Sequence, residues 1–394
     1  MSGTWKDAAN PRRLRRGTAL TLVFAGALAT GAATGSWGGV EGDSTPPAGE
    51  ASARRVPVGA VAEEAREAKE DAEDLVSRSG DRWSAAYTAR EYEGLEQSLD
   101  GAYTGTGITV EQAGVPGPGH AVDIARVQPG SPADRAGLRA GDRIRAVDGT
   151  RVRGVPVTEV VAMLRGATAE SPTDAAEPGS VVELTVRRDG REWRETLRRE
   201  RLTAETVTVD RTAPRTTRIK VTCFTEDSGA RVREAVEEAP EGSGFLLDLR
   251  GNSGGLVGEA TEAAGAFLDG GLVATYDHDG TQRALYADEG GDTEAPLVVL
   301  VDGGTMSAAE LLTGALQDRG RAVVVGSRTF GKGSVQVPHR MSDGSVAELT
   351  VGHYTTPSGH AVQGTGITPD LRVRAADRAE ARAGTVLSGL AAGS

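Results

Sequence analysis

Short apolar runs alternate with helical patterns from residue 218 onward, and this alternation restricts the fold more than any other feature of the chain. The apolar runs lie at 218–224, 244–249, 297–301, 322–325 and 347–353. Helical patterns lie at 229–238 and 257–268 and begin again near Ser307. Strands that alternate with helices are typical of a parallel sheet. We therefore expect an α/β domain with a largely parallel sheet.

Two polar residues follow neighbouring strands of this pattern. Ser307 opens a helical pattern just after the apolar run at 297–301 and the Asp-Gly-Gly break at 302–304. Lys332 lies between Gly331 and Gly333, in a loop that follows the next apolar run. A hydroxyl at a strand-to-helix turn and an amine in a glycine-walled loop form the candidate reaction centre.

A serine hydroxyl becomes a nucleophile only with a base beside it. Lysine can be that base if burial lowers its pKa towards neutrality. Only four of the 44 basic Lys and Arg residues are lysines, so Lys332 is either there by chance or serves a role that arginine cannot, namely losing its proton. Gln336 lies four residues further on and can hold the amine by a hydrogen bond. Histidine is the usual base, and the alternatives are His339, His353 and His360.

An oxyanion formed by attack on a carbonyl needs preorganised donors. The backbone N–H groups at the start of the Ser307 helix, including that of Ala308, are one source. The Gly254-Gly255 turn, at the end of another expected strand, is a second.

Several other functions are disfavoured by composition and spacing. A net charge of −12 argues against nucleic acid as a general partner. The run from Gly326 to Gly333 nearly fits a phosphate loop, but Gly333 stands where the Mg²⁺-binding hydroxyl is required. The single Cys223 excludes an intrachain disulfide framework. The five histidines lack metal-ligand spacing, so we expect neither a metal nor another cofactor.

The N-terminal region indicates export. Four arginines at positions 12–16 precede a mildly apolar run at 17–34, so residues 1–37 are expected to be a signal peptide or a single membrane anchor. A linker is expected at 38–58. Residues 59–102 contain helical patterns at 60–76 and 81–99 and are expected to form a helical arm. This arm is either a solvated element or a dimerisation or tethering element.

Residues 103–200 form a separate block. A glycine loop, short strands and the run SPADRAGLRAGDRI resemble a PDZ domain. The resemblance implies that a peptide C-terminus is added as a strand. The implied peptide-binding residues are the loop residues Gly105, Thr106, Gly107 and Ile108 and the helix residues Val160, Met163 and Leu164. The alternative is that these glycines only shape a turn. Residues 167–178 are expected to form a surface loop.

The segment from Val301 to Gln336 resembles the catalytic segment of the carboxy-terminal processing peptidases, the tail-specific serine proteases. DLRGNSGG at 248–255, FTED at 224–227 and the run at 354–370 match the same family, and the similarity covers about residues 80–372. It implies Ser307 as nucleophile, Lys332 as general base and Gln336 as its orienting partner. The implied oxyanion and supporting residues are Gly254, Gly255, Ala308, Glu310, Asp318 and Thr329.

Two departures from the family pattern flank the nucleophile. Thr305-Met306 stands where a small Ser-Ala pair is usual, and Asp302 stands where Asn is common. Neither removes a catalytic group.

The sequence therefore predicts an exported serine endopeptidase with a Ser–Lys mechanism. Its α/β core would span 201–374, followed by a frayed helix or tail at 375–394. Its partners would be protein or peptide substrates, bound by their C-termini. The rival from another class is an inactive PDZ scaffold on a decayed protease core. Such a core is expected to have lost Ser307, Lys332 or Gln336, and all three are present.

Overall fold

The computed structural model describes residues 69–394, apart from 114–120, 167–175 and the single positions 214, 279, 375 and 394. The expected signal or anchor segment, the linker, the start of the arm and most of the 167–178 loop lie outside the described residues. The chain divides into two compact units. The smaller contains Glu93–Glu205, and the larger combines Ala65–Tyr92 with Thr206–Ser394.

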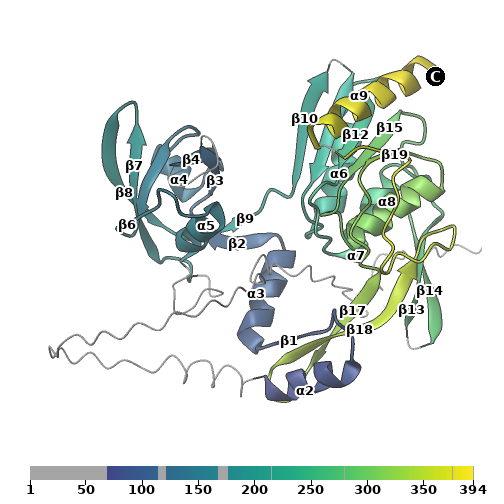
Figure 1. Ribbon diagram of the computed structural model, residues 1–394, viewed down its shortest axis with the longest axis horizontal. Helices are drawn as coiled ribbons and strands as arrows, with labels where there is room; N and C mark the ends of the chain where they lie inside the picture. Colours follow the sequence, from purple (N-terminus) through teal and green to yellow (C-terminus); the bar gives the residue numbers. More distant parts are fainter. Residues whose placement is uncertain are drawn as a thin grey trace, which may run out of the picture. The chain divides into compact units, whose positions relative to one another are not determined.

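A six-stranded sheet forms the centre of the larger unit (Figure 1). Every pair of neighbouring strands in it is parallel except the first, which is antiparallel. The two central strands are buried along their whole length, because their residues face helices on both sides. The strands, in spatial order, are β10 (Val207–Ala213), β11 (Thr216–Val221), β12 (Gly244–Asp248), β15 (Leu297–Val301), β16 (Val323–Gly326) and β19 (Leu371–Arg372).

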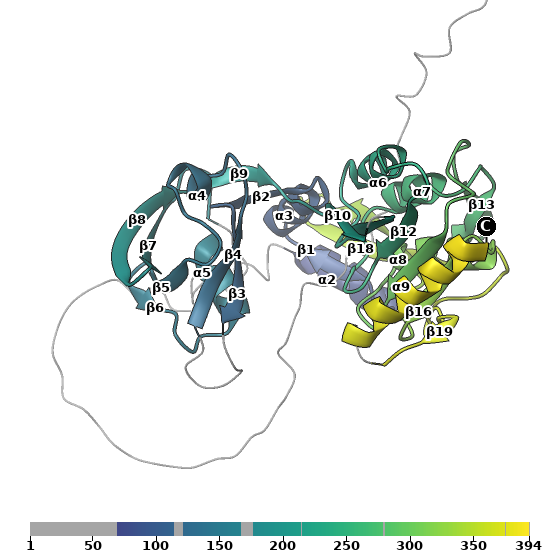
Figure 2. The ribbon, with the colours of Figure 1, turned by 90° about the horizontal axis from the view of Figure 1, so that it is seen from above.

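Helices cover both faces of this sheet (Figures 1 and 2). On one face lie α6 (Ser228–Glu237), α7 (Val257–Gly265) and α8 (Ala308–Asp318). On the other lies α9 (Ala376–Gly393), with Ala379, Ala383 and Leu387 buried in a core of their own against the strands. Of the two expectations for this segment, a frayed helix or a tail, a helix is present, but it is packed against the sheet and completes one of the cores of the larger unit. The apolar spacing on α9 is the signal that the sequence carried for it.

A second sheet of the larger unit is antiparallel and was not expected from the sequence. The core thus combines a parallel-rich sheet with an antiparallel one, rather than resting on a single largely parallel sheet. Its strands are β1 (Ala85–Tyr87), β13 (Leu272–His278), β14 (Thr281–Tyr286), β17 (Ser334–Arg340) and β18 (Val346–Thr355).

The arm differs from its prediction between residues 81 and 88. The structure has α2 (Glu70–Ser79), then β1, and only then α3 (Ala89–Leu99). The Asp81 carboxylate accepts the N–H groups of Trp83 and Ser84, and this turn ends any helix there. β1 then pairs with β18, with Ala85 opposite Glu348. Pairing with a distant strand has overridden the local helical pattern.

The smaller unit has its own hydrophobic core between a sheet and two helices. The helix α5 (Val157–Arg165) lies beside β3, and α4 (Pro132–Arg135) begins at Ser131, whose hydroxyl accepts the Asp134 N–H. The strands are β2 (Ala102–Gly105), β3 (Ile108–Ala113), β4 (Ala121–Val127), β5 (Arg143–Val147), β6 (Thr150–Arg151), β7 (Val181–Arg188), β8 (Arg191–Arg198) and β9 (Glu200–Thr203).

Within the described part of the chain, no helix is both long enough and apolar enough to cross a membrane.

Candidate active site

Ser307 stands at the turn between β15 and α8 with an unusual backbone conformation. Its φ is 55° and its ψ is −118°, values that a residue with a side chain rarely adopts. The side chain is buried, and its Oγ has no hydrogen-bond partner among the described residues. An unpaired hydroxyl at this turn fits the predicted role of nucleophile. Backbone strain of this kind is typical of functional positions.

Two glycines after β12 make room for Ser307. Gly254 has a φ of 100°, and a Cβ on it would lie 2.9 Å from the Ser307 Cβ. Gly255 has a φ of 126°, and a Cβ on it would lie 2.2 Å from the carbonyl oxygen of Phe224. Neither position tolerates a side chain, for reasons of both space and φ. The predicted glycine turn therefore contacts the predicted nucleophile directly.

Glu310 joins the backbone of Ser307 to the backbone of Lys332. Its Oε2 accepts the N–H of each, both at 2.9 Å. Its Oε1 accepts the N–H of Gly331 at 2.7 Å and the hydroxyl of Thr329. Burial raises the pKa of Glu310, while these four donors act in the opposite direction by stabilising the carboxylate. One buried side chain thus holds together the two backbone segments that carry Ser307 and Lys332.

Tyr354, on β18, makes a second connection that sequence reasoning did not single out. Its hydroxyl donates to the carbonyl oxygen of Ser307 at 2.9 Å and lies 3.4 Å from that of Lys332. Burial holds the pKa of this phenol well above its ordinary value, so it stays protonated and can donate.

Lys332 is 1% exposed, although it carries an amine. Its Nζ lies 5.2 Å from the centre of the Trp83 ring, in the arm. Burial lowers the pKa of Lys332 to about 8, while the nearby carboxylates of Glu348 and Asp81 act in the opposite direction. Half of the amine is then neutral at about pH 8, and a general base must be neutral to accept a proton.

Gln336 is fully buried on β17, and its amide Nε2 donates to the carbonyl oxygen of Trp83. Its Oε1 has no partner among the described residues. The predicted orienting residue is therefore held by the arm, and its acceptor oxygen is not engaged.

Buried polar atoms without a hydrogen-bond partner are concentrated on the elements that carry the candidate catalytic residues and their neighbours. Six buried side-chain atoms lack a hydrogen-bond partner within the described ranges, and five belong to the Ser307 turn, the Trp83 segment and strands β17 and β18. These five are Ser307 Oγ, Trp83 Nε1, Ser334 Oγ, Gln336 Oε1 and Glu348 Oε1.

Two backbone N–H groups next to Ser307 are available as donors. The N–H of Gly254 donates to the Asn252 side chain at 2.8 Å, and that of Ser307 donates to Glu310. Those of Gly255 and Ala308 make no hydrogen bond within the described residues. Of the donors expected from sequence, these two are free.

Thr329 and Asp318, the remaining residues predicted to support the site, accept hydrogen bonds from the backbone of nearby loops. Thr329 also accepts the Ile367 N–H at 2.7 Å, and Asp318 accepts the Ser358 N–H at 2.9 Å. The two departures from the family pattern are structural as well. Thr305 donates to the Leu249 carbonyl at 2.9 Å. Asp302 accepts the N–H groups of Gly251 and Gly304, which ties the nucleophile turn to the glycine turn.

The three candidate histidines are all exposed. His360 lies beside the carbonyl of Gly366, and no contact joins any of the three to Ser307. Among the described residues, no group of His, Cys, Asp and Glu side chains is arranged to hold a metal ion.

In the smaller unit, the predicted peptide-binding residues lie between β2 and β3 and on α5. Gly105 ends β2, Thr106 and Gly107 form the loop, and Ile108 begins β3. Val160 and Leu164 are buried in the core, whereas Ile108 and Met163 are partly buried against it. Gly107 has a φ of 79°, and a Cβ on it would lie 2.2 Å from the Ser131 Cβ, so this loop also requires glycine.

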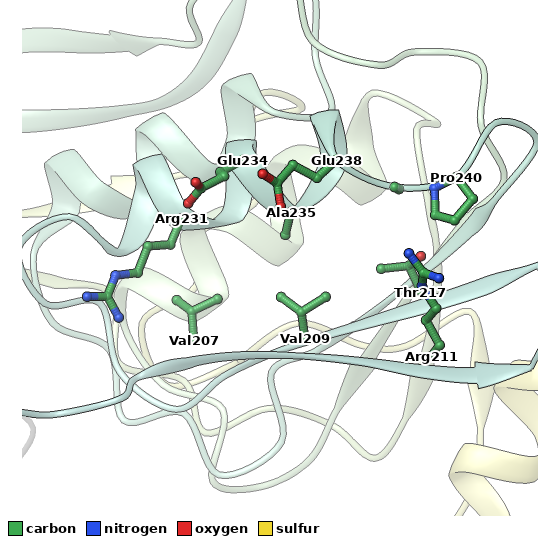
Figure 3. A pocket seen from close by; sticks show the side chains of 10 residues that line it. Val207, Val209, Arg211, Thr217, Arg231, Glu234, Ala235, Glu238 and Pro240 are labelled. Atoms are coloured by element: carbon green, nitrogen blue, oxygen red, sulfur yellow. The ribbon is translucent and has the colours of Figure 1, made fainter. Parts of the chain in front are cut away.

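A groove of about 470 Å³ lies elsewhere on the larger unit, between the edge strand β10 and α6 (Figure 3). Val207, Val209 and Ala235 line its floor, with charged side chains of both signs around them. None of the candidate catalytic residues lines it.

Comparisons with known proteins identify the family of the chain. The model of peptidase family S41 matches residues 215–373, and a PDZ model matches residues 124–173. A carboxyl-terminal-processing protease of Picosynechococcus is 31% identical over 318 residues, which cover 77% of this chain and 72% of the relative. The chain belongs to the carboxyl-terminal-processing proteases.

Other members of this protease family are longer than the chain. A chloroplastic carboxyl-terminal-processing peptidase of Arabidopsis thaliana is 34% identical over 313 residues, 75% of this chain but 58% of the relative. The chain thus spans about three fifths of the length of such relatives. Among solved structures, the photosystem II D1 C-terminal processing protease is 30% identical, with a TM-score of 0.47 over 76% of this chain and 80% of that one.

Proposed function

We propose that this member of the carboxyl-terminal-processing proteases is an exported serine endopeptidase that uses Ser307 and Lys332. The observation that carries the proposal is the shared carboxylate of Glu310, which ties the backbone of a buried lysine to the backbone of a strained serine. A buried amine with a pKa of about 8 is suited to take a proton from a hydroxyl.

The mechanism follows from this geometry. Neutral Lys332 takes the Ser307 proton as Oγ attacks the scissile carbonyl, and the ammonium then passes that proton to the leaving amine. An acyl-enzyme remains, and water, activated by the same lysine, releases it. Gln336 Oε1, which has no partner among the described residues, is the acceptor proposed to aim the amine.

The oxyanion is proposed to lie at the N–H groups of Gly255 and Ala308. Both belong to turns in contact with Ser307, and both lack a partner among the described residues. The N-terminus of α8 adds the positive end of its helix dipole. Gly254, whose own N–H is occupied, contributes space rather than a donor.

The PDZ unit is proposed to select substrates by their C-termini. A peptide would add to β3 beside α5, and its carboxylate would meet the loop from Gly105 to Ile108. The match of a PDZ model to residues 124–173, which include α5, supports the proposal. Export is proposed from the arginine-rich start and the apolar run at 17–34. Dimerisation through the arm remains the alternative to a solvated arm.

Cleavage of an unfolded protein substrate tests the chemistry. Ser307→Ala and Lys332→Ala are each expected to lower kcat by at least about a thousandfold, because each removes a reacting group. Lys332→Arg is expected to be equally inactive, since arginine stays charged. Thermal unfolding of each variant is the control for folding. Full activity in either alanine variant would contradict the proposed mechanism.

Histidine variants separate the two proposed bases. His339→Ala, His353→Ala and His360→Ala are expected to retain activity within about twofold, because these rings are exposed and away from Ser307. Loss of cleavage in one of them, with Lys332→Ala tolerated, would favour a histidine base instead. The inactive-scaffold alternative predicts no cleavage by the unaltered protein, but peptide binding by the PDZ unit.

Peptide chemistry tests the C-terminal selection. A substrate with a free C-terminal carboxylate is expected to be cleaved with a lower KM than the same peptide carrying a C-terminal amide. Equal KM values for the acid and the amide peptide would contradict the proposed selection by the PDZ unit. They would not bear on the proposed Ser–Lys mechanism.

A further inference from the structure

A buried carboxyl group close to Lys332 has no place in the mechanism above. Glu348 lies near the start of β18 and is 0% exposed. Its Oε1 has no partner among the described residues, and its Oε2 is reached only by the Tyr87 hydroxyl, at 3.4 Å. Acidic side chains are almost never fully buried without a partner.

The sheet register places this carboxyl on the same face as Gln336. On β17 and β18, Gln336 pairs with Thr350, and Pro338 pairs with Glu348. Because side chains alternate along a strand, Gln336, Glu348 and Thr350 project from the same face. β1 adds to the other side of β18 and places Ala85 opposite Glu348. The Trp83 carbonyl, at the start of this arm segment, is the acceptor for Gln336.

Glu348 and Lys332 each favour the charged form of the other. Burial raises the pKa of Glu348 to about 7, and the ammonium of Lys332 opposes this rise. The carboxylate of Glu348, in turn, favours the protonated form of Lys332. The other titratable groups near the pair come from the arm. Asp81, held as an anion by its hydrogen bond from Thr350, also favours the ammonium, and Tyr87 is kept protonated by burial.

We propose that Glu348 is a positioning residue that sets the pH above which Lys332 can accept the Ser307 proton. As an anion in a pocket of low dielectric constant, it stabilises the ammonium and so delays the appearance of the free base. The inference rests on the Ser–Lys mechanism proposed above. The Glu348 carboxyl makes no hydrogen bond to Ser307 among the described residues, and its proposed effect is exerted only through the amine.

The pH profile of kcat/KM is the first test. Glu348→Gln keeps the shape of the side chain and an acceptor for Tyr87, but removes the charge. Its acid limb is expected to move to lower pH by at least about half a unit, giving roughly threefold higher kcat/KM on the acid side. Glu289→Gln, the same change at an exposed position of the same unit, is the matched control and should leave the limb in place.

Direct titration of Lys332 is a test that does not depend on activity. The chain has only four lysines, so a protein labelled with ¹³C at the lysine ε-carbon gives few resonances to assign. In the Ser307→Ala background, the Lys332 resonance is expected to titrate at lower pH after Glu348→Gln. Glu348→Met, which removes the charge with an apolar side chain of similar length, should shift it in the same direction and guards against a folding defect of one variant.

The outcomes separate this inference from the proposed function. An unmoved titration in both folded Glu348 variants, while Ser307→Ala and Lys332→Ala abolish cleavage, overturns only the role of Glu348. A uniform loss of kcat/KM with no change in the acid limb also overturns it, because packing alone would explain that result. Retained activity in Lys332→Ala instead overturns the Ser–Lys mechanism itself.

Discussion

Gly254 shows how a single residue determines whether the backbone turn at Ser307 can pack against its neighbour. A methyl group there would lie 2.9 Å from the Ser307 Cβ, 3.2 Å from the Met306 carbonyl and 3.3 Å from the Ala308 nitrogen. Such a side chain would also have to adopt a φ of 100°. The nucleophile turn and the glycine turn therefore fit only because one of them carries no side chain.

Gly254→Ala is expected to lower kcat/KM by about a hundredfold or more, because the displaced turn misaligns the Ser307 hydroxyl and its oxyanion donors. Gly258→Ala is the control, since a Cβ on Gly258, which lies in α7, meets nothing within 4 Å. Cleavage assays together with thermal unfolding check this result. Near-normal activity in a folded Gly254→Ala protein would contradict it.

Elements contribute through the faces that they cover. α9 closes the face of the sheet that α6, α7 and α8 leave open, and its Leu387 side chain packs against Gly244 of β12. Leu387 is 3% exposed, whereas Leu390, one turn later, is 38% exposed. The helix is therefore part of the core that holds β15 in place before Ser307.

Leu387→Ala is expected to lower the free energy of unfolding by about 2–4 kcal/mol, through lost burial and a residual cavity. Leu390→Ala should cost less than about 1 kcal/mol, because little of its surface is buried. Denaturant unfolding of the two variants measures the difference. Equal effects would mean that α9 does not pack in solution as described.

The arm segment at Trp83 contributes to the burial of Lys332. The ring lies over Nζ and also packs edge-to-face against Phe330, with 5.8 Å between ring centres. Burial outweighs the two nearby carboxylates, since the pKa of Lys332 falls in spite of them.

Trp83→Ala is therefore expected to admit water and raise the pKa of Lys332, moving the acid limb of kcat/KM to higher pH. This direction is opposite to that expected for Glu348→Gln. Tyr286→Ala removes an aromatic ring that is 64% exposed and serves as the control. An acid limb that moves to lower pH in Trp83→Ala would show that the ring acts mainly by stabilising the ammonium.

At the scale of the whole molecule, the buried lysine makes stability depend on pH. The folded pKa of about 8 lies below the ordinary value of 10.5, so the unfolded chain binds more protons between these two values. Stability therefore rises with pH across this window, and the penalty for the buried ammonium is fully present only below it.

In the Ser307→Ala background, the free energy of unfolding is expected to gain about 1–3 kcal/mol from this group between pH 8 and pH 10.5. Lys332→Met should flatten that rise, because methionine does not titrate. Urea unfolding at several pH values provides the comparison. An identical rise in both proteins would place the titrating group elsewhere.

Local signals in the sequence were enough to predict the parallel strands and the helices between them, and to identify the family. Apolar runs such as 297–301 and helical periodicity are properties of short segments, and the glycine motifs carry their constraints within a few residues. Ser307, Lys332 and Gln336 could be named for the same reason, and their roles remain proposals.

Only the tertiary structure decided how distant segments meet. The start of the helix expected at 81–99 forms β1 instead, because a distant strand of the chain offers it a partner: Ala86 pairs with Ala347. That pairing accompanies the contact of Trp83 with Lys332, and the pairing of β13 with β18 includes Tyr354, whose hydroxyl reaches the carbonyl of Ser307. Such contacts depend on long-range register, which no local pattern encodes. The sequence by itself determined which groups are candidates to react, and the fold decided which neighbours surround the amine, because those neighbours come from segments far apart in the chain.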